Sequence, residues 1–154
     1  MYLALKLVHV LSSTVLFGTG LGTAFSMWRA HVHADARVVS AVTHNVVLAD
    51  WWFTTPAVIV QPVTGFALVR LAGFPLSSTW LELTFVLYVL AGACWIPVVW
   101  LQLRMRDLAN EAAAGGQPLS PRYHRYFKLW FWLGWPAFLS VVVIFGLMVF
   151  KPVL

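Results

Sequence analysis

The stretch LKLVHVLSSTVLFGTGLG, from Leu5 to Gly22, decides how this chain is organised. It is apolar and, with its neighbours, long enough to form a membrane-spanning helix, which needs about 20 residues. Two ionisable residues, Lys6 and His9, nevertheless lie within its first turns. A charged side chain near the bilayer centre costs about 3 kcal/mol or more, so such residues normally face the protein interior. We therefore expect other helices to supply partners for Lys6 and His9.

The composition places the whole chain in a lipid bilayer. Of its 154 residues, 61% are hydrophobic and only 10% are charged, whereas about 25% are charged in soluble domains. We predict an all-α fold, a four-transmembrane-helix bundle that forms one domain over residues 1–154. The expected spans are residues 2–28, 43–70, 80–103 and 126–150.

The charges predict an orientation rather than a polyanionic partner. The net charge is +5, but the basic residues lie in connections between apolar runs, so we expect no nucleic-acid binding. Seven of the ten Lys and Arg residues fall on one side of the bundle: Arg29, Arg37, Arg104, Arg106, Arg122, Arg125 and Lys128. Cytoplasmic connections are rich in Lys and Arg, so both termini should be extracytoplasmic. Residues 29–41 and 104–123 are the predicted connections on the cytoplasmic side, the second of them flexible.

Several polar side chains share the predicted depth of His9, near the extracytoplasmic face. They are Lys6, Gln61, Thr64, Glu82, Met148 and Lys151. The other four histidines belong to the cytoplasmic side: His31, His33, His44 and His124. A haem held by two histidines of one chain is therefore not expected. Two arrangements remain, a haem on His9 with Met148, Lys151 or Gln61 as a weaker sixth ligand, and a haem shared across a homodimer.

The first span has a face that suits a flat ligand. Ser13 and Gly20 follow His9 at helical spacing, and small groups beside a histidine leave room for a macrocycle. Close helix packing is the alternative interpretation, because Gly18 and Gly22 form a small-xxx-small pattern.

The second span carries polar residues at helical spacing, namely Thr43, Asp50, Thr54, Gln61 and Thr64. Such a stripe must face the bundle interior or a cavity. Two prolines in the same span, at positions 56 and 62, predict a bend whose freed carbonyls are satisfied inside the bundle.

Two alternatives are open for the ionisable and amide groups of these spans. Asp50 is expected to pair with Arg122 or Arg125, whereas the deeper Gln61 could belong to a proton path. Glu82 is either a solvated carboxylate or a counter-ion of Lys6 or Lys151, with which it could exchange protons.

Two terminal motifs resemble those of HemJ, the membrane protoporphyrinogen oxidase family. They are Lys6-Leu7-Val8-His9 and Val149-Phe150-Lys151-Pro152. The resemblance implies a haem b bound through His9 and a required lysine at Lys151. HemJ-like proteins also carry a third-span histidine where this chain has Gly92-Ala93-Cys94-Trp95.

A closer resemblance is to an uncharacterised family of small bacterial integral membrane proteins. It is carried by motifs such as Ala49-Asp50-Trp51, Gln61-Pro62-x-Thr64-Gly65, Leu133-Gly134-Trp135-Pro136 and Leu147-Met148-Val149-x-Lys151-Pro152. Both families look similar to a wider group that includes copper-resistance permease-like proteins. The resemblance implies the bacterial cytoplasmic (inner) membrane.

We therefore expect a b-type haem protein that transfers electrons between a porphyrinogen-like or quinone-like reductant and the respiratory chain. In this hypothesis His9 binds the iron, Lys6, Gln61 and Met148 surround the haem, and Lys151 and Glu82 are catalytic. The alternative is a non-enzymatic membrane subunit or assembly partner of a larger complex, such as a respiratory-chain complex, with no cofactor of its own. Copper handling is a third interpretation, although Met27, Met105 and Cys94 do not share one depth.

Overall fold

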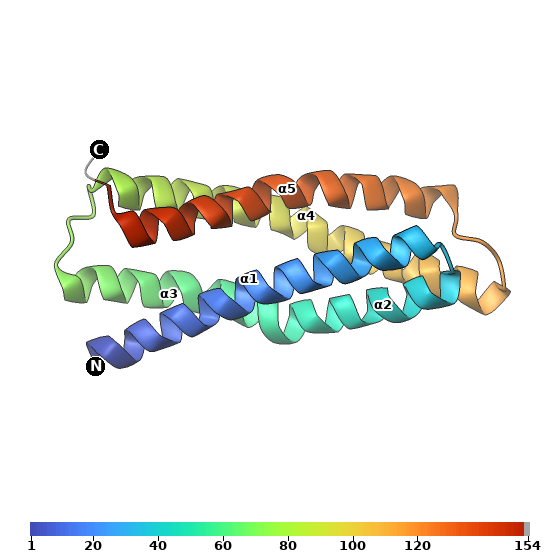
Figure 1. The fold of residues 1–154 in the computed structure, drawn as a ribbon, viewed down its shortest axis with the longest axis horizontal. Coiled ribbons are helices and arrows are strands. Elements are labelled where there is room, and N and C mark those ends of the chain that lie inside the picture. The colour runs from blue at the N-terminus through green and yellow to red at the C-terminus, as the bar shows by residue number, and fades with distance from the viewer. Residues whose placement is uncertain (153–154) are drawn as a thin grey trace.

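The computed structural model describes residues 1–152, whose regular secondary structure consists of helices (Figure 1). The helices are α1 (Tyr2–His33), α2 (Ala36–Ala49), η1 (Asp50–Thr54), α3 (Thr55–Ala72), α4 (Thr79–Gly115) and α5 (Pro121–Phe150). Because α2, η1 and α3 are continuous, they form one rod, and with α1, α4 and α5 the chain has four rods. Each is long and apolar enough to cross a membrane. The predicted all-α bundle of four transmembrane helices is confirmed.

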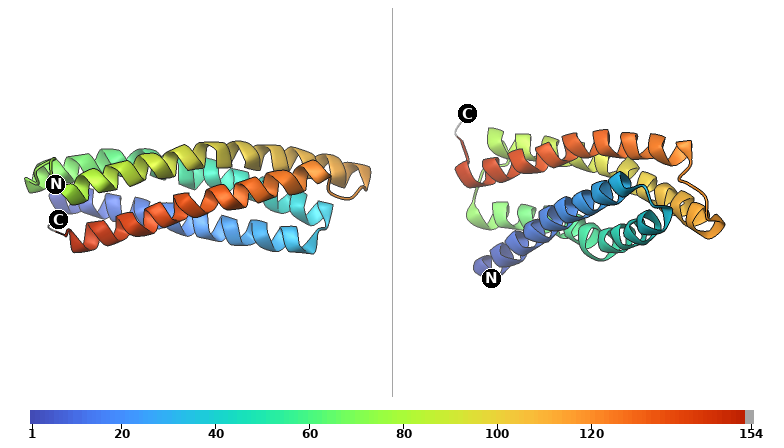
Figure 2. Two further views of the ribbon diagram at one scale, coloured as in Figure 1. Left: turned by 90° about the horizontal axis from the view of Figure 1, so that it is seen from above. Right: turned by 45° about the vertical axis from the view of Figure 1, so that its right-hand side comes forward.

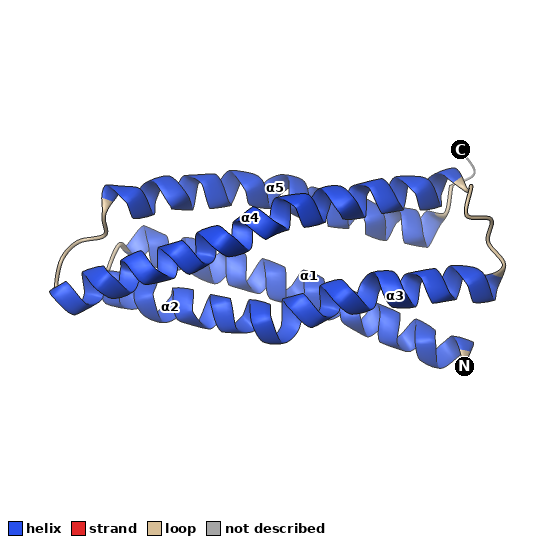
Figure 3. Cartoon of the chain, turned by 180° about the vertical axis from the view of Figure 1, so that it is seen from behind, coloured by secondary structure: helices blue, strands red, loops and turns tan. Residues whose placement is uncertain are grey.

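The two ends of the bundle differ in what they carry. Both chain termini and the α3–α4 connection lie at one end, which we call the terminal end (Figures 1 and 3). The α1–α2 and α4–α5 connections lie at the other, which we call the basic end because the seven clustered Lys and Arg residues are on its side. The two termini therefore share a side, as the order of spans predicts.

The first predicted connection is shorter than expected. The polarity of residues 29–41 predicts a loop, but α1 continues to His33 and α2 begins at Ala36. Ala34 turns the chain with a left-handed φ of 56°. Asp35 then caps α2, because its Oδ1 accepts a hydrogen bond of 2.8 Å from the backbone N–H of Arg37.

The flexible connection predicted at residues 104–123 is also mostly helical. Helix α4 runs on to Gly115 and stops where Gly116 adopts a φ of 60°. The segment is polar, but it is rich in Ala, Arg, Leu, Met and Glu, which are strong helix formers. It also buries a face, because Met105, Ala109 and Ala112 belong to the hydrophobic core. Polarity identified the end of the membrane crossing rather than the end of the helix.

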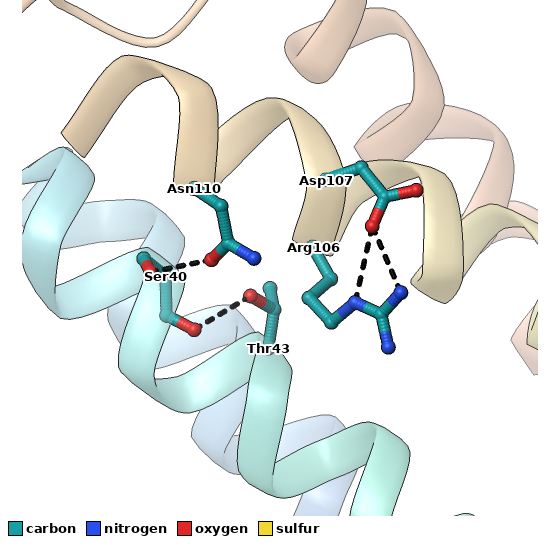
Figure 4. Close-up of polar contacts among 5 residues, drawn as sticks. All are labelled: Ser40, Thr43, Arg106, Asp107 and Asn110. Carbon is teal, nitrogen blue, oxygen red and sulfur yellow. Dashed lines mark hydrogen bonds and ion pairs between the residues drawn. The ribbon is translucent and has the colours of Figure 1, made fainter. Parts of the chain in front are cut away.

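All four rods meet at the basic end. Met27 of α1, Val39 of α2, Met105 of α4 and Tyr123 of α5 are fully buried there. Polar contacts flank this core (Figure 4), where the Ser40 hydroxyl donates to Oδ1 of Asn110 at 2.7 Å and so joins α2 to α4. In the same view Arg106 forms an ion pair with its neighbour Asp107 at 2.9 Å.

Towards the terminal end the rods separate into two pairs. Helix α1 packs on α3, and α4 packs on α5, whereas the most extensive contact between the two pairs is that of α2 with α4 (Figures 1 and 2). Helix α4 accordingly crosses from α5 at the terminal end to α2 at the basic end (Figure 3). Between the two pairs lies a cavity lined by residues of all four rods.

The second rod passes its two prolines without a break. Directly before Pro56 the helix widens into the π turn η1, in which the N–H of Thr55 donates to the carbonyl of Asp50. Pro62 lies inside α3 and lacks an N–H, so the carbonyl of Val58 has no helical donor. The hydroxyl of Tyr88 on α4 donates to this carbonyl instead. The prediction that a freed carbonyl is satisfied inside the bundle is confirmed at Val58.

Candidate functional site

His9 lies half-buried on α1 and faces α3. Its Nδ1 is 2.8 Å from the hydroxyl oxygen of Thr64. The same hydroxyl is 2.7 Å from the carbonyl oxygen of Val60, which can only accept a hydrogen bond. The hydroxyl also lies 3.2 Å from the carbonyl oxygen of Gln61, so two carbonyls of its own helix can take its single hydrogen. In the tautomer of His9 with the proton on Nδ1, Thr64 accepts from Nδ1–H and Nε2 carries the lone pair.

The backbone beneath His9 is also tied to α3. The side-chain amide of Gln61 donates from Nε2 to the carbonyl of His9 and to the hydroxyl of Ser12, both at 2.8 Å. Ser12 in turn donates to the carbonyl of His9 at 3.0 Å. These hydrogen bonds fix the height of α1 against α3, and hence the depth of the imidazole.

Gly65 gives the imidazole its room. A Cβ at this position would lie 3.2 Å from Cε1 of His9, which is closer than ordinary van der Waals contact. The absence of a side chain thus lets the ring lie directly over the α3 backbone. Thr64 and Gly65 are adjacent in the sequence and both contact the ring of His9. Thr64 forms its hydrogen bond, and Gly65 packs against its Cε1 atom.

A central cavity of about 350 Å³ occupies the space between the helix pairs. Its volume falls in the range of about 300–1,000 Å³ that is usual for small-molecule sites. Nine aromatic residues line it: Phe17, Trp28, Tyr88, Trp95, Trp130, Phe131, Trp135, Phe138 and Phe145. Gln61 and Ser13 line it as well, whereas His9 is not among its lining residues. The cavity therefore begins next to the His9 group, with Gln61 common to both.

Asp50 lies in the wall of this cavity and is only 6% exposed. The Thr54 hydroxyl donates to its Oδ1 at 2.8 Å, and the side chain of Gln102 on α4 also forms a hydrogen bond with the carboxyl. The ion pair predicted with Arg122 or Arg125 is wrong. Asp50 lies well inside the bundle, and Arg122 instead donates to the hydroxyl of Tyr126 on its own helix at 2.9 Å.

The polar stripe of the second span faces inward, as predicted. Thr43, Asp50, Thr54 and Thr64 are buried and Gln61 is half-buried. Gly18 and Gly22 of the first span do not pack closely against another described helix of this chain. A Cβ added to Gly18 or Gly22 would meet no atom of the described residues within 4 Å.

The remaining predicted residues lie at the terminal end without joining His9. Lys6 and Glu82 are exposed, and Met148 is half-buried. The ammonium of Lys151 lies 4.7 Å from the ring centre of Phe74. Within residues 1–152 neither lysine forms an ion pair with Glu82. Of the predicted group, the structure brings together His9, Gln61 and Thr64.

Gln102 and Tyr88 are cavity residues that sequence reasoning missed. A lone amide near the end of an otherwise apolar span was the available signal for Gln102, since such a group needs a partner inside the bundle. The signal for Tyr88 was indirect. A proline inside one span predicts that another span offers a donor to the freed carbonyl.

The described part of the chain contains no cluster of three or more His, Cys, Asp or Glu residues able to hold a metal ion. Met27 and Met105 are core residues of the basic end. His31 stacks on Phe127 with ring centres 3.6 Å apart. These contacts give the copper interpretation no support.

The sequence matches the model of a protein family described as "Predicted integral membrane protein (DUF2269)" over residues 3–152. No curated protein and no solved structure matches the chain. The family match confirms the resemblance to an uncharacterised group of integral membrane proteins, while the relation to HemJ stays a prediction.

Proposed function

The chain belongs to this DUF2269 family of predicted integral membrane proteins, and we propose that it binds a b-type haem through Nε2 of His9. The observation that carries the proposal is the hydrogen bond between Thr64 and Nδ1 of His9, because a proton on Nδ1 leaves a lone pair on Nε2. Histidines that bind metals characteristically donate their other ring N–H to a fixed acceptor. Nε2 itself has no hydrogen bond among residues 1–152.

The residues around His9 fit this role. Gly65 leaves room for Cε1 of the imidazole against the α3 backbone, and Gln61 fixes the depth of the His9 backbone. The haem would supply one-electron redox chemistry. The protein would orient the ligand through Thr64 and hold the two helices in register through Gln61.

Electron transfer is the activity that this arrangement and the HemJ-like terminal motifs support. In that proposal Lys151 and Glu82, both at the terminal end, would be the catalytic residues and would exchange protons near the haem. Location in a bacterial inner membrane, with electrons passed to the respiratory chain, belongs to the same proposal.

The direct test is the visible absorption of the purified protein after expression with a haem precursor. We expect a Soret band in the wild type and its loss in His9→Ala, with unchanged helical circular dichroism in both. A wild-type protein that takes up no haem would overturn the proposal.

The same contacts favour one second candidate, a cofactor-free membrane subunit or assembly partner. Gln61 and Thr64 connect α1 to α3 whether or not a ligand is present. In that case His9→Ala lowers the melting temperature and the absorption spectrum shows no haem in either protein.

A further inference from the structure

The central cavity is a site distinct from His9, because His9 does not line it. Its walls are mainly aromatic rings from α1, α4 and α5, together with small residues such as Gly20, Gly92 and Gly134. Flat, apolar walls of this kind favour a planar apolar ligand over a charged one.

Two buried polar atoms in these walls have no partner among the described residues. Gln102 is 4% exposed and its Oε1 accepts no hydrogen bond, and Trp130 is 6% exposed and its Nε1 donates none. Buried polar atoms are nearly always paired in native proteins, so each exception needs an explanation. The orphaned set comprises one acceptor, on α4, and one donor, on α5.

The backbone is also specialised at this point. The π turn η1 begins at Asp50, and Asp50 and Thr54 both line the cavity. Single π turns within longer helices occur frequently at functional sites. The carboxyl of Asp50 hydrogen-bonds to Gln102, so the π turn and the orphaned amide belong to one polar group in an otherwise apolar space.

We propose that this cavity binds a hydroquinone, with its ring among the aromatic walls and its hydroxyl groups at Gln102 and Trp130. A hydroxyl can donate to Oε1 of Gln102 and can accept from Nε1 of Trp130. An acyl chain of a lipid fills such walls but pairs with neither atom. The oxidised quinone has carbonyl oxygens that only accept, so it leaves Oε1 of Gln102 unpaired. The cavity therefore prefers the reduced form of the ligand.

The test is calorimetric titration of the detergent-solubilised full-length protein with a decyl-substituted benzoquinone, in its oxidised and its chemically reduced form under argon. We expect the reduced form to bind about tenfold more tightly, the difference that one additional hydrogen bond supplies. Gln102→Leu keeps the size of the side chain and removes the acceptor, so the two forms should then bind equally. Trp130→Phe keeps an aromatic wall and removes the donor, so both forms should bind more weakly.

Ser40→Ala is the matched control. It also removes a polar contact between the second rod and α4, the hydrogen bond to Asn110, but at the basic end and outside the cavity. Its affinities for both forms should equal those of the wild type. The measurement is repeated in His9→Ala, where we expect the same preference because the cavity site does not require haem. The proposal is overturned if neither form binds, if bound phospholipid cannot be displaced, or if Gln102→Leu retains the preference.

Discussion

The hydroxyl oxygen of Thr64 on α3 lies 2.8 Å from Nδ1 of His9 on α1. Because the carbonyls of Val60 and Gln61 are within reach of the hydroxyl hydrogen, Thr64 can accept from Nδ1–H and leave the lone pair of the ring on Nε2. One threonine thereby connects the packing of two membrane helices to the chemistry of Nε2. Substitutions at single positions can separate these two roles.

Thr64→Val should weaken haem binding more than it disturbs the fold. The substitution keeps the branched shape of the side chain but removes the acceptor for Nδ1–H, and loss of such an orienting partner typically costs about 10–100-fold in metal affinity. Thr64→Ser retains the hydroxyl and should stay near wild type. Titration of haem into the apo proteins, followed at the Soret maximum, measures both. Equal affinities for the valine and serine variants would show that the hydroxyl has no orienting role.

Gly65→Val should displace the imidazole. Its Cβ would start 3.2 Å from Cε1 of His9, and the two methyl groups extend further. We expect weaker haem binding in the same titration. Gly146→Val is the control on α5, where an added Cβ meets no atom of the described residues within 4 Å. If the two glycine variants bind haem equally well, close packing at Gly65 does not position the ring.

Tyr88→Phe should destabilise the bundle by about 1–3 kcal/mol, because it leaves the half-buried carbonyl of Val58 unpaired beside Pro62. Tyr126→Phe removes an exposed hydroxyl contact with Arg122. A surface change of that kind should stay within about 0.5 kcal/mol. Thermal unfolding followed by circular dichroism compares them. If Tyr88→Phe unfolds at the wild-type temperature, the Tyr88 hydroxyl does not stabilise the carbonyl that Pro62 leaves without a helical donor.

Met105→Ala should lower the free energy of unfolding by about 2–5 kcal/mol, since it opens a hole in the fully buried core of the basic end. Haem binding should persist in the folded protein, because the core lies at the end of the bundle away from His9. Chemical denaturation and the Soret absorption, measured on one sample, test both parts. Loss of haem from a fully folded Met105→Ala protein would contradict this separation of core and site.

The four spans and the inward face of the polar stripe could be predicted from the sequence. Hydropathy records where the chain can cross lipid, and a polar group within an apolar run must turn inward. The inward orientation of His9, Gln61 and Thr64 followed from that constraint. The limits of the helices did not follow, because α1 and α4 extend beyond the apolar residues and continue on helix propensity and core packing.

The hydrogen-bond partners of Asp50 and the central cavity could not be predicted from the sequence, for a different reason. Hydropathy gives the depth of a residue along its own helix, but the neighbour across the bundle depends on how the rods cross. The crossing of α4 from α5 to α2 brings Gln102 rather than an arginine to Asp50. The same crossing opens the space between the helix pairs, which no local pattern encodes.

The central claim is that Nε2 of His9 binds the haem iron, and rescue of His9→Gly by free imidazole tests it most directly. The variant keeps Thr64 and Gly65 and leaves an opening the size of the missing ring. We predict that the variant lacks a Soret band after haem is added and regains it as imidazole is titrated in, while His9→Leu, whose side chain fills the opening, does not respond. A Soret band of wild-type intensity in His9→Gly without imidazole would contradict the claim.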